Sequence, residues 1–548
     1  MVSKLFSIAL AKDSQIELFS NILIKVEKQL RKKSKKLWDL EKLSPGSLLS
    51  KYSPSGMYLC YLNNKVIGTV ILQERDYLFW PEYVSSSEAY YIHKLSLLSQ
   101  YRGKGFSFKF LELVEKKAIQ DNKKYIRLDC NEDMPNVSKI YETFGFKKVK
   151  LKKIEGKRVI LYEKKLAPSL FLDVYQKNNF IFEGAGHLSL NNKENTTLDL
   201  LSGVSTNILG FNNKKIRYIA KKQIDKYIHL SNYHNSRAQI EMLDLMKKIT
   251  HLEKYLLLNS SSEANEALLT ILNNSSILNA NSKNKIITFK NSFFGRTYGC
   301  RMLNSGGRYG NLFIKSIPAN DLEKIKTELN EKVLAIYLEL IQGHGGIIPI
   351  KRKIIKYIKA AAEKNKIYII VDETLTGLGR CNYPFLYQKF KLKPNALIVG
   401  KGLGGGFPLS VLCTDKSISN LVVKGIYGST LGGNSVACVC GKYILRFITN
   451  PKERKKIREN SGYLRVKLEH LSKRFNFGLL GEGYLIGLRF NSEKEAKKFQ
   501  LETIKNNLFV DTVDNNTIRI MPPLDITRSE IEFIINKFIE IFRKLQNE

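Results

Sequence analysis

Two short and almost entirely apolar runs, each ending in charged residues, constrain the fold of this chain most strongly. Ile367–Val371 is followed by Asp372-Glu373, and Ala396–Val399 is followed by a glycine-rich turn that contains Lys401. Leu334–Leu340 and Ile367–Val371 are near-continuous apolar runs, which are typical of parallel strands that are buried on both faces. Because α/β folds bind ligands at the carboxyl ends of such strands, we expect an α/β unit with its site at these residues.

The residues that follow these strands carry reactive chemistry. Lys401 stands among glycines, where its amine has no large neighbour and is available as a nucleophile. Asp372 and Glu373 end a buried strand and need a cationic partner, because burial of an unpaired charge is costly. Upstream, Tyr255–Leu258 leads into Asn259-Ser260-Ser261-Ser262 at a helix start, where hydroxyls and amides can hold a phosphate. Taken alone, these features also fit a solvent-exposed lysine and a simple helix cap.

Four further motifs accompany these residues: Phe293-Phe294-Gly295-Arg296-Thr297, Glu339–Gly346, Thr430–Asn434 and Ile518–Leu524. In this order, the motifs resemble the class III aminotransferases, closest to their acetylornithine and ornithine aminotransferase subgroup, over nearly all of residues 170–545. The resemblance implies a fold type I domain at residues 166–548, with a large parallel sheet and a small C-terminal α/β subdomain at about residues 450–548. It also implies pyridoxal 5'-phosphate as the cofactor and a homodimer or a multiple of dimers.

The resemblance assigns a role to each matching position. Lys401 would bind the cofactor covalently, Asp372 would pair with its pyridine nitrogen, and Phe293 would stack on its ring. The remaining positions contact phosphate or substrate: Ser261 and Ser262 on the phosphate, Thr430 on the phosphate of the neighbouring subunit, and Arg296, Glu339 and Arg519 at the substrate. Arginine suits a substrate carboxylate because its guanidinium can bind both oxygens.

Several positions depart from the family pattern. Ser261 stands at the usual glycine of the phosphate turn, and Leu375 stands at a glutamine that hydrogen-bonds the phenolic oxygen of the cofactor. His344 replaces a glutamate that can pair with the arginine matched by Arg519. These changes leave two alternatives open: a decayed aminotransferase that dimerises an active partner domain, or another reaction with the same cofactor, such as racemisation or decarboxylation.

The N-terminal part contains a strand, a glycine turn, a helix and a second strand in that order. Tyr91–Leu97 runs into Gln100–Ser107, and a helix with Phe110, Leu111, Val114 and Ala118 at helical spacing follows. Tyr125–Asp129 is the second strand, and Tyr141 with Gly145-Phe146 comes next. Glycines let the backbone approach a ligand, and amides at a helix N-terminus favour a phosphate group.

These motifs resemble the GNAT-type N-acetyltransferases, over roughly residues 5–165, which implies a mixed-sheet domain at residues 1–165 and acetyl-CoA as co-substrate. The loop residues that would hold its pyrophosphate are Gln100, Arg102, Gly103, Lys104, Gly105, Phe106 and Ser107. Tyr141 would protonate the departing thiolate. His93 is a candidate for the base that deprotonates the amine. A packed aromatic at Tyr141 and a structural histidine at His93 are the alternatives, and Met134 stands where many relatives carry an asparagine.

Composition excludes several other classes of protein. The 89 lysines and arginines exceed the 51 acidic residues by 38, but the excess is spread over both parts and forms no basic tail, so we expect no nucleic-acid partner. The seven cysteines form no CxxC pair, which indicates reduced, mostly buried thiols and no metal site. No apolar run is long enough to span a membrane, and we expect a cytoplasmic protein.

The sequence therefore predicts a bifunctional enzyme. One part would transfer an amino group between an amino acid and a 2-oxo acid, with a diamino acid or its N-acetyl derivative as a candidate substrate. The other part would transfer acetyl from acetyl-CoA to an amine. The seam between them is expected near Lys164–Ser169, because Pro168 disfavours helix there.

Overall fold

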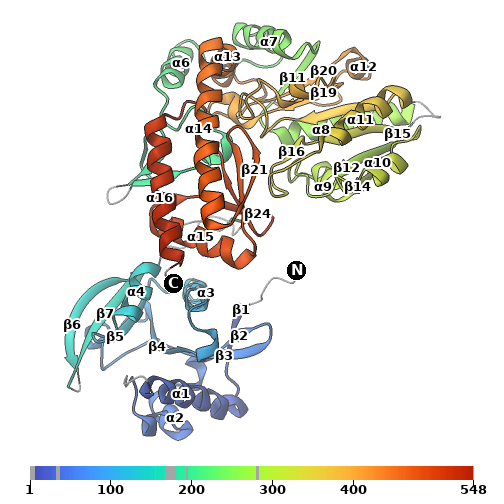
Figure 1. Ribbon diagram of the computed structural model, residues 1–548. Helices are drawn as coiled ribbons and strands as arrows, with labels where there is room; N and C mark the ends of the chain where they lie inside the picture. Colours follow the sequence, from blue (N-terminus) through green and yellow to red (C-terminus); the bar gives the residue numbers. More distant parts are fainter. Residues whose placement is uncertain are drawn as a thin grey trace. The chain divides into compact units, whose positions relative to one another are not determined.

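The computed structural model describes residues 6–32, 37–84, 86–154, 156–166, 174–175, 181–192, 196–278 and 283–546. The chain divides into two compact units, Met1–Asn179 and Phe180–Glu548 (Figure 1). Pro168, on which the predicted domain boundary depends, lies outside the described residues, so that boundary stays a prediction.

Unit 1 is built on a seven-stranded sheet with the order β1-β2-β3-β4-β5-β7-β6. The strands are β1 (Phe6–Leu10), β2 (Met57–Leu62), β3 (Lys65–Gln73), β4 (Ala89–Leu97), β5 (Tyr125–Asn131), β6 (Lys147–Ile154) and β7 (Lys157–Lys165). β4 and β5 run parallel, whereas the other described pairs in this sheet are antiparallel. The parallel pairing ends where Ile92 lies opposite Leu128, although both strands continue beyond it.

Four α-helices accompany this sheet in unit 1: α1 (Ile16–Arg31), α2 (Pro45–Lys51), α3 (Phe106–Gln120) and α4 (Pro135–Phe144). α3 begins directly after the glycine turn, as the sequence predicts. Its buried residues are Phe110, Leu111, Val114 and Ala118, which are the four residues found at helical spacing in the sequence. These side chains join the core on one face of the sheet, so packing fixes the position of the helix N-terminus.

Unit 2 contains an eight-stranded sheet with the order β11-β20-β19-β18-β15-β12-β14-β13. The strands are β11 (Lys254–Leu258), β12 (Lys285–Phe289), β13 (Gly307–Tyr309), β14 (Leu312–Ile317), β15 (Val333–Leu338), β18 (Tyr368–Asp372), β19 (Ala396–Val399) and β20 (Ser410–Thr414). The five central strands, from β19 to β14, are parallel. Every residue of β15 is buried, and so is every residue of β18 except Tyr368, which confirms the prediction of strands covered on both faces.

Helices cover the two faces of this sheet and create two separate cores. α8 (Ser261–Leu278) packs on one face with Tyr337 and Ile370. α11 (Arg352–Asn365) and α13 (Ser435–Thr449) belong to the core of the other face. Successive residues of a strand point to opposite faces of the sheet, so each central strand contributes side chains to both cores.

The C-terminal part of unit 2 adds an antiparallel sheet with the order β21-β22-β25-β24. Its strands are β21 (Gly478–Glu482), β22 (Leu485–Arg489), β24 (Asp511–Val513) and β25 (Thr517–Ile520). The helices α14 (Pro451–Phe475) and α16 (Arg528–Gln546) lie side by side beside it, and α15 (Glu493–Lys505) packs on α16 (Figure 1). The start of unit 2 also joins this region, because β10 (Thr196–Asp199) pairs in parallel with β23 (Leu508–Phe509).

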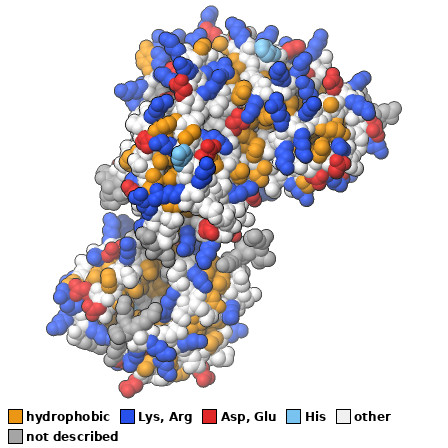
Figure 2. All heavy atoms as spheres, in the orientation of Figure 1, with side chains coloured by type: hydrophobic (Ala, Val, Ile, Leu, Met, Phe, Trp, Pro, Cys, Tyr) orange, Lys and Arg blue, Asp and Glu red, His pale blue; other side chains and the backbone are white. Residues whose placement is uncertain are grey.

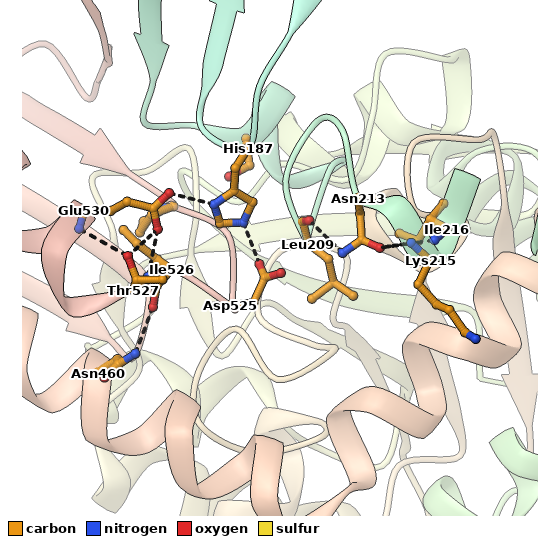
Figure 3. Close-up of polar contacts among 12 residues, drawn as sticks. His187, Leu209, Asn213, Lys215, Ile216, Asn460, Asp525, Ile526, Thr527 and Glu530 are labelled. Carbon is orange, nitrogen blue, oxygen red and sulfur yellow. Dashed lines mark hydrogen bonds and ion pairs between the residues drawn. The ribbon is translucent and has the colours of Figure 1, made fainter. Parts of the chain in front are cut away.

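A histidine with two carboxylate partners fastens this N-terminal segment to the C-terminal helix. His187 lies between β8 (Gly184–Ala185) and β9 (Ser189–Asn191). Its Nε2 lies 3.0 Å from Oδ1 of Asp525, and its Nδ1 lies 2.8 Å from Oε1 of Glu530 in the first turn of α16 (Figure 3). Hydrogen bonds to Asp525 and Glu530 raise the pKa of His187 to about 10. The imidazole is therefore charged at neutral pH and bridges both acids.

Replacement of His187 with glutamine is expected to destabilise unit 2 by about 1–3 kcal/mol near pH 6, because two carboxylates lose a shared cation. The pKa of the imidazole is raised on folding, so its contribution is complete below the unfolded value of about 6.5 and disappears as pH rises through about 10. Chemical denaturation of both proteins near pH 6 and near pH 10 measures this. A stability difference that is equal at both pH values would contradict the assignment.

The structure shows how the charged side chains are distributed on the surface and whether the cysteines are paired. Lysine and arginine side chains are scattered among acidic and apolar ones on the visible face and form no single stripe there (Figure 2). All seven cysteines are buried and unpaired. In the described part of the chain, no helix is both long and apolar enough to cross a membrane.

Candidate active sites

The largest cluster of predicted site residues surrounds a cavity in unit 2 with a volume of about 350 Å³. It lies at the carboxyl ends of β18 and β19, where the sequence predicts it. The predicted residues in its lining are Ser261, Ser262, Phe293, Glu339, Asp372 and Lys401. These residues come from separate segments of the chain, which the parallel sheet and α8 bring to one place.

Gly400 separates Lys401 from the end of β19, and Lys401 begins a short 3-10 helix, Lys401–Gly404. Its φ of +47° is uncommon for a residue with a side chain and is typical of functional positions. Burial, and then the charge of Arg519, lower the pKa of Lys401 to about 8 against the opposing influence of Asp372 and Glu339. A substantial fraction of the amine is therefore neutral near physiological pH, which a nucleophilic lysine requires.

Asp372 is the last residue of β18 and is buried. Its Oδ2 accepts a hydrogen bond from Nδ2 of Asn265 at 3.0 Å, and its Oδ1 accepts one from the amide of Thr374 at 2.9 Å. These donors fix the carboxylate, although burial still raises its pKa. Asn265 was missed in the sequence because it lies in the helix α8, which the fold places against the end of β18.

Glu373 corrects the expectation that both acids need a cation. Its carboxylate accepts hydrogen bonds from the amides of Leu386 and Tyr387, at 2.7 and 2.6 Å, and from the hydroxyl of Thr376 at 3.1 Å. Burial raises its pKa to about 7. Backbone amides therefore satisfy Glu373, and of the two acids only Asp372 lines the cavity.

The serine turn lies at the N-terminus of α8, on the wall of the cavity. Oγ of Ser261 accepts a hydrogen bond from Oγ1 of Thr374 at 2.8 Å. A side chain at Gly400 would place its Cβ 2.2 Å from the Ser261 hydroxyl, and one at Gly295 would come equally close to that of Ser262. Two glycines thus leave room for the two hydroxyls. This accommodates Ser261 at the position where the family usually has glycine, and the helix end favours an anion.

Another part of the cavity wall contains an aromatic ring and a second buried acid. The amide of Phe293 donates to Oε2 of Glu339 at 2.8 Å, and the Phe293 ring centroid lies 4.2 Å from that of His344. Burial, and then Asp372, raise the pKa of Glu339 to about 8. Burial, and then Arg519, lower the pKa of His344 to about 3, so its ring is neutral.

Arg519 lies outside the cavity lining and already has a carboxylate partner. On β25 it faces Asp511 of β24, with Nε 3.1 Å from Oδ1 and Nη2 2.5 Å from Oδ2. Its Nη1 also donates to the carbonyl of Gly343 at 3.1 Å. Asp511 was missed in the sequence, because only the register of the β24–β25 pair brings it opposite Arg519. Asp511 is thus the carboxylate partner of Arg519 in this chain, where His344 replaces the glutamate of the family pattern.

Two other predicted residues also lie outside the lining. Arg296 and Thr430 are exposed. The carbonyl of Thr430 accepts a hydrogen bond from Nε2 of His229 at 3.0 Å, and the neighbouring Ser429 hydroxyl lies 2.7 Å from Nδ2 of Asn259. The Thr430 segment therefore lies beside the serine turn of its own chain, with the Thr430 side chain on the surface.

The candidate pyrophosphate loop of unit 1 connects β4 to α3. Gly103 and Gly105 have φ values of +71° and +74°, and Gly105 is the N-cap of α3, which Phe106 and Ser107 begin. The side chains of Arg102 and Lys104 donate to the carbonyls of Leu97 and Gln100, at 2.9 and 2.7 Å. Within the described residues, the amides of Gly103, Lys104 and Gly105 have no hydrogen-bond partner. Free amides beside a helix N-terminus suit a pyrophosphate.

Tyr141 lies on α4, whose end is fixed by a left-handed glycine. Gly145 caps the helix at φ +98°, and the amide of Phe146 donates to the carbonyl of Tyr141 at 3.0 Å. α4 packs against the start of α3, because the ring of Phe108 lies 6.2 Å from that of Phe144. Burial, and then Cys130 and Asp129, raise the pKa of Tyr141 above its ordinary value. The phenol therefore stays protonated and can donate its proton.

The structure thus offers two candidate sites. One has a lysine amine and a buried aspartate at the ends of adjacent parallel strands, and the other has a glycine turn at a helix N-terminus. Comparison with known families identifies both units. Residues 173–542 match the model of the family described as aminotransferase class-III, and residues 25–146 match that of the acetyltransferase (GNAT) family. The chain belongs to the class III aminotransferase family and carries a GNAT acetyltransferase domain. The first family uses pyridoxal 5'-phosphate, and the second uses acetyl-CoA.

Individual relatives agree with this family assignment. The chain is 32% identical to acetylornithine aminotransferase of Clostridium acetobutylicum, over 68% of this chain and 99% of that protein. It is 29% identical to acetylornithine/succinyldiaminopimelate aminotransferase of Buchnera aphidicola subsp. Schizaphis graminum, over 66% and 93%. The fold also resembles the crystal structure of ornithine aminotransferase from Toxoplasma gondii, with a TM-score of 0.64 and 21% identity, over 69% of this chain and 93% of that one.

Proposed function

We propose that this chain is a bifunctional enzyme that transfers an amino group between an amino acid and a 2-oxo acid in unit 2 and an acetyl group from acetyl-CoA to an amine in unit 1. The observation that supports the first activity most is the position of Lys401 and Asp372 in one cavity, at the ends of β19 and β18. The volume of this cavity, about 350 Å³, is within the range of small-molecule sites.

The residues of the cavity fit the cofactor of the family. Asp372 is a fixed and buried carboxylate, and among the described residues no lysine or arginine forms an ion pair with it. A protonated ring nitrogen would supply that cation. Ser261 and Ser262 offer hydroxyls at a helix N-terminus for the phosphate, and Phe293 offers a ring face. When bound, the cofactor acts as an electron sink.

In the proposed reaction, Lys401 anchors the cofactor through its amine and, once released, moves a proton at the substrate carbon. The lowered pKa of Lys401 suits both tasks, since a base works best with a pKa near the working pH. Asp372 keeps the ring nitrogen protonated. Intact Lys401 and Asp372 argue against a decayed aminotransferase. The room that Gly400 leaves for the Ser261 hydroxyl also weakens one of the changes that motivate that alternative.

Arg519 and Arg296 are the proposed binding groups for the substrate carboxylate. Arg519 is paired with Asp511, so it would have to exchange that partner for the substrate. The relatives whose names specify acetylornithine motivate an N-acetylated diamino acid, or the diamino acid itself, as the amino donor. Such a compound is also what acetylation of a diamino acid in unit 1 would produce.

The two activities can be tested together in one experiment. The protein would be incubated with pyridoxal phosphate, acetyl-CoA, 2-oxoglutarate and a panel of ornithine, lysine and 2,4-diaminobutyrate, and the products identified by mass. The proposal predicts glutamate from the amino transfer and an N-acetylated amine from the acetyl transfer. Formation of decarboxylated or racemised amino acid without glutamate would support the alternative use of the same cofactor.

We also expect a dimer or a multiple of dimers, held by unit 2. Thr430 is exposed and absent from the lining of its own cavity, which fits the family's use of this threonine at the site of the neighbouring subunit. A two-fold interface would bring each Thr430 to the serine turn of the partner. Light scattering at micromolar concentration measures the mass, and a monomer that transfers amino groups at full rate would exclude a shared site.

A further inference from the structure

Unit 1 contains a cluster of one histidine and two aspartates at the point where β4 and β5 separate. The parallel pairing of these strands ends at Ile92 and Leu128, and His93 and Asp129 are the next residues on each strand. β4 also has a bulge here, because Ser96 lies opposite Thr69 and His93 lies opposite Ile71. Lys94 adopts a φ of +50° within it. Bulges of this kind re-aim side chains and are common beside active sites.

The third member of the cluster, Asp76, comes from the loop after β3. Its Oδ1 accepts hydrogen bonds from the amides of Leu78 and Phe79, both at 3.0 Å, which fixes the carboxylate. Its Oδ2 lies 3.2 Å from Nε2 of His93, and Nδ1 of His93 lies 3.7 Å from Oδ1 of Asp129. The His93 and Asp76 side chains are 9% and 6% exposed, whereas that of Asp129 is 23% exposed. The open side of the cluster is therefore at Asp129.

The protein satisfies the polar atoms of this cluster only in part. Nε2 of His93 and Oδ2 of Asp76 are buried, and within the described residues each has only the other as a partner, at 3.2 Å and without the geometry of a hydrogen bond. Buried polar atoms that are not fully satisfied are rare in folded proteins and indicate a ligand, a water or a catalytic role. In a chain with a net charge of +38, two carboxylates that face one imidazole also form a locally acidic site.

Aromatic side chains form walls around His93. The rings of Tyr52 and Phe79 lie 5.8 and 6.3 Å from the imidazole. Burial, and then the charges of Asp129 and Asp76, raise the pKa of Tyr52, so its phenol stays protonated. Burial raises the pKa of Asp129, and the charge of Lys94, whose amine lies 4.5 Å from the centre of the Trp38 ring, opposes that rise. Carboxylates together with aromatic faces attract a cation.

We propose that His93, Asp76 and Asp129 form the binding site for the acceptor of unit 1, and that this acceptor is the alkylammonium group of a small amine. The proposal rests on the proposed acetyl transfer, for which His93 is the candidate base, and adds the two aspartates that bind the acceptor and orient that base. Asp129 binds the cation at the open side, and His93 removes its proton. Asp76 is a positioning residue that orients the imidazole.

The acetyl transfer needs no chemical group beyond His93, Tyr141 and the two substrates. The ammonium gives one proton to His93, and the free amine attacks the acetyl carbon of acetyl-CoA. A carbon–nitrogen bond forms and the carbon–sulfur bond breaks. Tyr141, which also lies near enough to Asp129 for that charge to raise its pKa, protonates the leaving thiolate and regains a proton from the new amide nitrogen. His93 then releases its proton to solvent, so the products are the acetylated amine and CoA.

Three variants, assayed in the full-length protein with ornithine, lysine and 2,4-diaminobutyrate as acceptors, test this site. His93→Gln should lower kcat for acetyl transfer by about 10²–10⁴-fold, the range of general-base catalysis. Asp129→Asn should raise KM for the amine while kcat stays within a few-fold. Asp76→Asn should lower kcat and leave KM nearly unchanged. Asp133→Asn, an exposed acid close in sequence to Asp129, is the matched control and should change neither.

Calorimetry with acetyl-CoA separates this proposal from the proposed function. If the wild-type protein and His93→Gln bind acetyl-CoA equally and only the variant fails to acetylate, the site is supported. If both bind acetyl-CoA and acetylate at the same rate, the site is wrong, although the acetyltransferase stands. A wild-type protein that binds no acetyl-CoA overturns both. Equal losses in kcat and in acetyl-CoA affinity would assign His93 a structural role and overturn the site.

Discussion

Replacing Lys401 with alanine is expected to abolish amino transfer, with a fall in rate of at least about 10²–10⁴-fold, because the amine is the only lysine in the cavity lining that the described residues form. The variant should also lose the absorbance near the visible edge that the protein acquires with pyridoxal phosphate. Acetyl transfer should be unaffected, because unit 1 has its own core and its own loop.

A matched control for this variant is Lys391→Ala. Lys391 has a φ of +51°, close to the +47° of Lys401, but it is exposed and absent from the cavity lining. Both changes therefore remove a lysine from a left-handed position, and only one should remove the chemistry. Amino transfer at the wild-type rate in the Lys401 variant would refute the assignment of this lysine.

Replacing Gly103 with glutamate is expected to weaken acetyl-CoA binding by at least about tenfold. A residue with a side chain at φ +71° has a backbone strain on the order of 1–2 kcal/mol, which disfavours the loop conformation that would bind the ligand. The glutamate carboxylate would also repel the pyrophosphate. A Cβ at Gly103 meets no atom within 4 Å, so the effect should arise from the ligand and the backbone rather than from a clash. Calorimetry with acetyl-CoA measures the change in affinity.

Gly156→Glu provides the control for backbone strain. Gly156 lies between β6 and β7, has a φ of +80°, and also has open space where a Cβ would lie. This substitution should cost similar stability and leave acetyl-CoA affinity unchanged. If the two variants bind acetyl-CoA equally well, the loop from Gln100 to Ser107 does not hold the pyrophosphate.

Local patterns in the sequence were sufficient to predict much of the fold. The apolar runs before Asp372 and Lys401 are buried parallel strands, since a strand covered on both faces has no polar alternation. The four apolar residues of α3 are buried because a helix packs one face. In both cases the pattern and the packing involve the same few consecutive residues.

Contacts that depend on pairing between distant segments could not be predicted in this way. Asp511 meets Arg519 only through the register of an antiparallel pair, and Glu373 is satisfied by amides thirteen and fourteen residues further on. The acids at His93 come from two other segments of unit 1. A sequence motif gives the identity of a residue, whereas its partner is decided by tertiary packing.

The central claim is that one chain holds two separate transferase sites, and the most direct test is to assay both reactions in both variants. The account predicts complementary losses: Lys401→Ala transfers acetyl but no amino groups, and Gly103→Glu transfers amino groups with acetyl transfer impaired at limiting acetyl-CoA. A variant that loses both reactions while remaining folded, or a Lys401 variant that retains amino transfer, would contradict two independent sites.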